Sequence, residues 1–324
     1  MRIISFFVLF FCLIGFDLQS QTVEYYRRMS MDDRQYTYSP HEKIDSAIAR
    51  KTNCYKVTFD EEKRIKYIRY EKLGKQAVGR RKISFIRFSY SDSLEIRFFD
   101  YPIPTETNRI HSQHLILNSD KIPIAVVFYD KNGKITKDDY GISRYERILN
   151  DEGWMVECRF YDETGNRITN NNGDYYYRYE WKNDSIFYRP ELSYYDEHDN
   201  LHNGKRGYSV VKMAFYKEGE RLPYEERYFD AQLQPALCAG GYAIYRKAYY
   251  KNGLLKTELF LDGKEKPIND KSGFCRIEYE YNKYGNRATF NCYMKDVDKK
   301  YLKCKIEYDK DQKVTKRLKE WKSE

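Results

Sequence analysis

The sequence predicts an all-β protein: an elongated antiparallel array of β-hairpins with a period of about 33 residues, preceded by a short N-terminal helix. One observation is a repeat, in which an Asp follows an aromatic pair, with a looser pattern at the last two positions. The intervals are 32, 34, 34, 32 and 34 residues, and the aspartates are Asp130, Asp162, Asp196, Asp230, Asp262 and Asp296. The other is the alternation of apolar and polar residues between turns, as in "CRIEYEY" (275–281), which is typical of strands. A steady period of this kind predicts a repeat architecture.

Residues 1–20 are predicted to be a secretory signal peptide. Arg2 supplies a positive charge, an apolar run from Ile3 to Phe16 follows, and the polar "DLQSQ" allows cleavage after Ser20. The run is shorter than the roughly 20 residues that span a bilayer, so an uncleaved anchor is the alternative interpretation. No later segment is apolar enough to cross a membrane. We therefore expect export to the periplasm, the outer surface or the medium, with no membrane span after cleavage.

Residues 21–54 are predicted to form an N-terminal cap that contains the short helix. Ser39 is placed as its N-cap, Pro40 as its first residue and Glu42 at the third position, which is the pattern of a capping box. One apolar stripe follows, made of Ile44, Ala47 and Ile48. Because a repeat array needs its open end covered, we expect this helix to cap the first hairpin.

The repeats themselves occupy the rest of the chain. Residues 55–127 read as degenerate hairpins, 128–300 as regular hairpin repeats, and 301–324 as a C-terminal half repeat with a basic tail. Most turns carry Gly where the backbone needs a positive φ, as in a type I turn followed by a left-handed residue. Asp199 and Gln312 occupy the equivalent places in two turns, and the Asp or Asn that opens a turn is expected to bond the local backbone.

The pattern of "YYDE" (194–197) and "YYKNGLLKTELFLDGK" (249–264) resembles tandem Tyr-Asp/Gly β-hairpin repeats of bacterial envelope proteins, in the style of RHS/YD-like or variant MORN-like repeats. The resemblance covers about residues 55–321. It implies a repeat scaffold at the cell envelope.

Composition agrees with a folded, exported chain. Charged residues make up 33% of the sequence, but 34 Tyr and 18 Phe supply the apolar area that disordered chains lack. The net charge of +9 comes from interspersed residues, which on strands indicate a solvated face with cross-strand pairs. Export argues against nucleic acid as a partner.

Three cysteines near the C-terminus give the most specific structural prediction. If "NKYG" (282–285) is a four-residue loop, Cys275 lies opposite Cys292, and a further turn near residue 298 places Cys292 opposite Cys304. One cross-strand disulfide is possible in an exported protein, with Cys292 taking a single partner. The alternatives are small buried apolar groups or, least favoured, a metal site.

A ridge of aromatic residues is the candidate ligand surface. Four aromatic side chains follow the Gly-bearing connections at one level of the array: Tyr175, Tyr208, Tyr242 and Phe274. They either stack on a ligand or cover the sheet's own core. No nucleophile elbow, phosphate loop or catalytic triad pattern occurs, so we expect no enzyme, no cofactor and no metal. The sequence therefore predicts a non-catalytic exported scaffold that binds an envelope protein, with binding of a cell-wall or surface glycan as the alternative.

Overall fold

The protein is described here by a computed structural model, which covers residues 21–32, 37–78, 83–100, 110–184, 187–215, 223–295, 300–310 and 312–323. The predicted signal peptide (1–20) and Asp296 lie outside these ranges. Within them, 21 strands form one continuous antiparallel sheet. The prediction of an all-β hairpin array is confirmed.

The N-terminal half of the sheet departs from simple chain order at one point. β1 lies between β2 and β3, and from β3 onward each strand pairs with the next, apart from the short β5 beside β4. The strands are β1 (Thr22–Asp32), β2 (Thr37–Ile44), β3 (Asn53–Phe59), β4 (Ile65–Lys72), β5 (Lys75–Gln76), β6 (Phe85–Tyr90), β7 (Leu94–Asp100), β8 (Ser112–Leu117) and β9 (Pro123–Tyr129).

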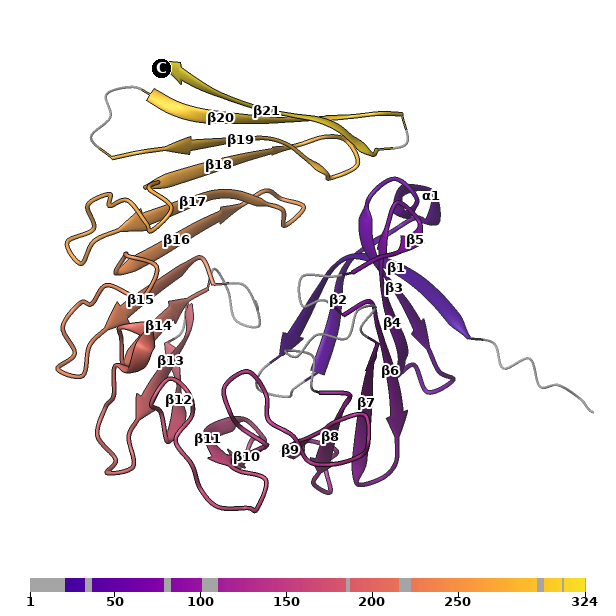
Figure 1. The fold of residues 1–324 in the computed structure, drawn as a ribbon, viewed down its shortest axis with the longest axis vertical. Coiled ribbons are helices and arrows are strands. Elements are labelled where there is room, and N and C mark those ends of the chain that lie inside the picture. Colours follow the sequence, from indigo (N-terminus) through magenta and orange to yellow (C-terminus); the bar gives the residue numbers. More distant parts are fainter. Residues whose placement is uncertain are drawn as a thin grey trace, which may run out of the picture.

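The C-terminal half continues the sheet because β9 pairs with β10. Its elements are β10 (Arg144–Leu149), β11 (Met155–Tyr161), β12 (Tyr176–Asp184), β13 (Phe187–Tyr195), the 3-10 helix η1 (Gly204–Arg206), β14 (Val210–Ala214), β15 (Glu225–Phe229), β16 (Ile244–Tyr249), β17 (Leu255–Leu261), β18 (Arg276–Tyr281), β19 (Arg287–Tyr293), β20 (Lys300–Tyr308) and β21 (Val314–Ser323). The strands follow one another around a curve, from the N-terminal strands on one side to β21 on the other (Figure 1). The predicted boundaries at 54/55, 127/128 and 300/301 fall within β3, β9 and β20, so they divide the repeat pattern but not the sheet.

The predicted helix is displaced. Helix α1 spans only Ser46–Ala49, with Asp45 as its N-cap, whereas Ser39 and Pro40 lie in β2 opposite Ser30 and Met29 of β1. Among the described strands β2 pairs with β1 alone, so it is an edge strand. Proline is tolerated there because its missing N–H leaves no neighbouring strand without a hydrogen bond. Pairing with a long neighbouring strand therefore outweighed the local capping pattern. No helix within the described residues is long and apolar enough to cross a membrane.

The turns share one geometry. In the turn at Asp162, the side-chain Oδ1 accepts hydrogen bonds from the backbone N–H of Thr164 (2.8 Å) and Asn166 (2.9 Å), and Gly165 has a φ of 88°. The bonds to the carboxylate, with that from the Thr164 hydroxyl the largest cause, lower the pKa of Asp162. Asp199 (φ 64°) and Gln312 (φ 63°) take the left-handed conformation, which confirms their predicted place in the turns.

Each regular unit also has a second turn, and these turns are bonded to one another. They start at Asp138, Asn170, Gly204, Cys238 and Asp270. In each of the last four of these turns, the backbone N–H of the residue after the first one donates a hydrogen bond to a carbonyl of the second turn in the preceding unit. Examples are Asn171 to Tyr140 (2.8 Å) and Ala239 to Arg206 (2.7 Å). Equivalent residues of successive units are therefore held in columns, one above another.

The two faces of the repeat sheet differ in chemistry. One face, called the inner face, carries aromatic rings such as Phe160 and Tyr228, both of which are buried. The opposite, outer face carries cross-strand ion pairs: Glu225 lies opposite Arg246 and bonds it, and Glu265 receives hydrogen bonds from Arg246 (2.7 Å) and Arg227 (2.7 Å). These bonds, with that from Arg246 the largest cause, lower the pKa of Glu265 to about 2. The predicted alternation of charges into cross-strand pairs is confirmed on this face.

The N-terminal cap touches the turns of distant units. Arg28 of β1 donates to the carbonyl of Gly253, in the turn between β16 and β17. Next to α1, the Thr52 hydroxyl donates to Asn286 Oδ1 (2.8 Å), and Asn286 Nδ2 donates to the carbonyl of Lys51 (3.0 Å), which binds the turn between β18 and β19. The curve of the sheet is thus closed by contacts between chain segments more than 200 residues apart.

Candidate functional site

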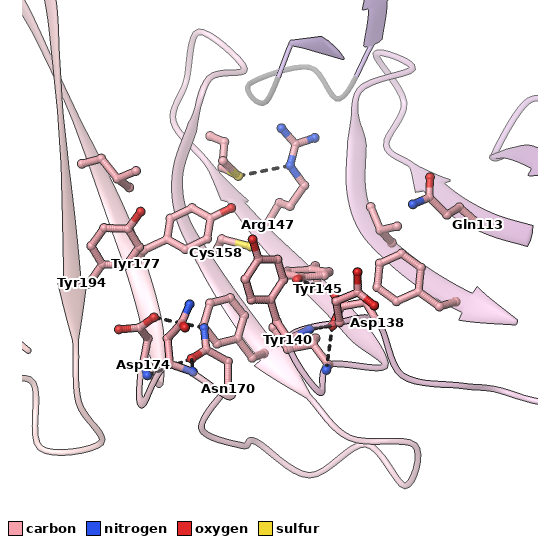
Figure 2. Close-up of a pocket in the computed structure, with 18 of the residues that line it drawn as sticks. Gln113, Asp138, Tyr140, Tyr145, Arg147, Cys158, Asn170, Asp174, Tyr177 and Tyr194 are labelled. Atoms are coloured by element: carbon pink, nitrogen blue, oxygen red, sulfur yellow. Dashed lines mark hydrogen bonds between the residues drawn. The ribbon is translucent and has the colours of Figure 1, made fainter. Parts of the chain in front are cut away.

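A large cavity lies on the inner face. Its volume is about 790 Å³, and it is lined by residues of β7 to β13, by the second turns at 138 and 170, by Arg206 and Tyr208 before β14, and by Tyr38 of β2. Figure 2 shows two polar groups at its wall, Asp138 with Tyr140 and Tyr145, and Asp174 with Asn170. A concave, aromatic wall with a few converging polar groups is the usual form of a ligand site.

An aromatic ladder forms the wall of this cavity and continues beyond it. Successive ring centroids lie between 4.7 and 6.1 Å apart, mostly edge to face or tilted, which are favourable arrangements. The ladder runs through Phe128, Tyr145, Phe160, Tyr177, Tyr194, Tyr208, Tyr228, Tyr242 and Phe260. Burial raises the pKa of four of its tyrosines, so their hydroxyl groups stay neutral: Tyr194, Tyr208, Tyr228 and Tyr242.

Asp138 opens a second turn at one end of the cavity. Its Oδ1 accepts hydrogen bonds from the backbone N–H of Tyr140 (2.9 Å) and Ile142 (3.0 Å), and its Oδ2 accepts one from the Tyr145 hydroxyl (2.5 Å). Burial outweighs these bonds and raises the pKa of the Asp138 carboxyl. The side chain of Tyr140, in the same turn, is 52% exposed and stands at the mouth of the cavity.

Asp174 and Arg206 form an ion pair at the other end. Arg206 Nη2 donates to Asp174 Oδ2, which also accepts from Asn170 Nδ2 (3.1 Å). The side chain of Asp174 is 1% exposed and that of Arg206 is 11% exposed. The guanidinium carbon lies 3.5 Å from the ring centroid of Tyr194, so the pair is packed against the aromatic ladder.

The predicted ridge is only partly assembled. Tyr208 and Tyr242 belong to the aromatic ladder, where Tyr228 lies between them. Phe274 is the equivalent residue of the next unit and is half-buried. Tyr175 occupies a different column, because it stands two residues after its glycine instead of one, and it packs against Arg167, whose guanidinium carbon is 4.1 Å from the ring centroid. In this unit the residue directly after the glycine, equivalent to Tyr208, Tyr242 and Phe274, is Asp174.

The predicted alignment of cysteines is wrong in register. Cys292 lies opposite Ile277 of β18 and Leu302 of β20, and Cys304 lies opposite Phe290. Two extra residues cause the shift. Five residues instead of four lie between Tyr281 and its partner Arg287, and a β-bulge then leaves Ala288 of β19 without an opposite residue in β18.

All three cysteines are nevertheless buried. Cys275, Cys292 and Cys304 are each less than a tenth exposed, and Cys292 and Cys304 have free thiols. Burial is the largest cause that raises the pKa of Cys292 to about 11, and it raises that of Cys304 too. In this arrangement they pack as small apolar groups, and a disulfide stays a prediction for thiol counting on the unfolded, unreduced protein.

Sequence reasoning missed Asp138, Asp174 and Arg206. The signal for the last two was present in the alignment of units. The column that holds Asp174 otherwise holds Ile142, Tyr208, Tyr242 and Phe274, and a carboxylate among them is an exception. A search of protein-family models and of curated proteins with this sequence gives no match.

Proposed function

We propose that the protein is an exported, non-catalytic repeat scaffold of the bacterial cell envelope that presents its inner face to a partner protein. One observation carries the proposal: the aromatic ladder passes from unit to unit and reaches an open cavity, where the half-exposed Tyr140 stands at the mouth. Exposed tyrosine beside a packed aromatic wall is typical of protein-binding surfaces, because the ring buries area at little entropic cost.

Glycan binding is the second candidate. The observation that favours it is the combination, in one cavity, of tyrosine rings with Asp, Asn and Arg side chains, since flat rings stack on sugars and polar groups bond their hydroxyls. The resemblance to RHS/YD-like or variant MORN-like repeats fits either candidate.

A pull-down of tagged residues 21–324 from the source organism's envelope extract tests the proposal, with bound protein and bound sugar both identified by mass spectrometry. The test variant is Tyr140→Ser, at the cavity mouth. The matched control is Trp321→Ala in β21, which is 54% exposed and does not line the cavity. We expect one enriched protein that survives glycosidase treatment, is lost with Tyr140→Ser and is retained with Trp321→Ala. Polysaccharide without protein would replace the first candidate by the second, and equal capture by both variants would remove the inner face from the proposal.

A further inference from the structure

Two departures from the repeat meet at one point of the cavity wall. Asp174 stands in a column of apolar and aromatic residues, and Arg206 stands in the column of Tyr140, Asn172, Gly240 and Ser272. Each is the charged exception in its column, and the two belong to adjacent units. In a chain built by repetition, paired exceptions that contact one another indicate a local requirement that the common unit does not meet.

The pair leaves hydrogen-bonding capacity unused. Asp174 Oδ1 and Arg206 Nη1 are both buried, and neither makes a hydrogen bond to any group in the part of the chain that the structure describes. The other carboxylate oxygen, Oδ2, and the other terminal guanidinium nitrogen, Nη2, form the hydrogen bond that joins the two side chains. A buried acceptor without a partner is costly, and the cost rises when the acceptor is ionised. Both residues line the cavity, so an occupant of the cavity would lie beside the pair.

The chemistry of that occupant follows from what remains on the pair. The charges of Asp174 and Arg206 offset each other, so the site favours neither a cation nor an anion. What it offers is one unused acceptor, on Asp174, and one unused donor, on Arg206. Two adjacent hydroxyl groups match it, because one donates to the carboxylate oxygen while the other accepts from the guanidinium.

We propose that Asp174 and Arg206 form a subsite that binds the vicinal diol of a neutral sugar residue. Tyr177 and Asn172 also line the cavity, so an aromatic ring and an amide lie in the same wall. The subsite rests on glycan binding, the second candidate function, and gives it a location. It shares the cavity with the protein-binding proposal but is tested by a different experiment, so the failure of one can be told from the failure of the other.

The test measures binding of the neutral polysaccharide fraction of the source organism's envelope, applied in two forms. One form is intact. The other is oxidised with periodate, which cleaves vicinal diols, and the aldehydes that form are then reduced with borohydride. We expect the wild-type protein to bind the intact form at least tenfold more tightly than the oxidised form. Asp174→Asn and Arg206→Lys should each lose at least tenfold in affinity for the intact form, and the outer-face control Glu265→Gln should lose nothing.

A further variant controls for misfolding. Asp174→Tyr combined with Arg206→Ser places in both columns residues that the chain itself uses there, in Tyr208 and Ser272. It should unfold at a denaturant concentration close to that of the wild type and bind no glycan. Full binding by this variant, equal binding of oxidised and intact glycan, preference for an acidic fraction, or no binding of either form by the wild type would each overturn the subsite. The last result would leave the protein-binding proposal to the pull-down.

Discussion

Replacing Asp174 by Tyr and Arg206 by Ser, singly and together, separates the energy of their ion pair from the energy of its surroundings. The side chains are 1% and 11% exposed, so solvent screens the pair little. Arg206→Ser leaves the Asp174 carboxylate buried with only the Asn170 amide to bond it. Asp174→Tyr leaves the guanidinium, which is 11% exposed, on the ring of Tyr194.

The expected free energies of unfolding follow from this asymmetry. Removing one partner of a buried ion pair typically costs about 3–5 kcal/mol, and we expect Arg206→Ser to fall in that range and Asp174→Tyr at or below its lower end. The double variant loses the pair together with the cation–π contact, worth about 0.5–2 kcal/mol. It gains a buried tyrosine ring, worth about 1.5–3 kcal/mol. Its stability should therefore lie within about 2 kcal/mol of the wild type.

Urea unfolding provides the assay, followed by circular dichroism and by intrinsic fluorescence on the same samples. Coincidence of the two transitions would justify a single free energy for each variant. The coupling energy of the cycle should exceed about 2 kcal/mol. If the two single costs simply add in the double variant, or if Arg206→Ser unfolds like the wild type, the ion pair does not have the buried character assigned to it.

Three other perturbations test different parts of the structure. Leu233 has a φ of 60° and is 53% exposed, so Leu233→Gly should raise stability by about 0.5–1 kcal/mol, and a lower urea midpoint would contradict the turn geometry. Burial raises the pKa of Asp138, so the native state binds its proton more tightly than the unfolded state and stability falls as pH rises through the window above the ordinary pKa. Asp138→Asn, which copies Asn170, should therefore be stabilised relative to the wild type more at pH 7 than at pH 4. The same dependence of urea midpoint on pH in the variant and the wild type would contradict this. Half-buried Cys238 should react with iodoacetamide before Cys54, whose pKa burial raises to about 12, and equal labelling in the native protein would refute that order.

Much of the fold could be predicted because its determinants are local. Alternating residues identified the strands, and the opening Asp or Asn with its left-handed residue identified the turns, even where Asp199 or Gln312 replaces Gly. The errors arose where distant pairing decides the outcome. Ser39 and Pro40 carry a helix-start pattern, but β1 pairs with them. A turn of five residues and a bulge at Ala288 shift the pairing of the cysteines by two residues, and the local sequence marks neither.

The candidate site was harder to predict for a physical reason. Tyr175 looked equivalent to Tyr208 because both are aromatic and follow a glycine, yet the difference of one residue places them in different columns. The cavity forms only when the sheet curves and brings Tyr38 of β2 opposite β10 to β13. No single unit encodes the curvature or the contact across it, so the cavity that Asp138, Asp174 and Arg206 line became visible only in three dimensions.

The contacts that close the curve limit how this protein can change in length. A stack in which each unit touches only its neighbours can gain or lose a unit and remain folded. Here Arg28 and Thr52 bond two particular turns, at Gly253 and Asn286. Duplication or deletion of one unit between them would move those turns out of reach. The closure therefore constrains the number of repeats, because these contacts form only when the turns at Gly253 and Asn286 lie at their present distance along the sheet.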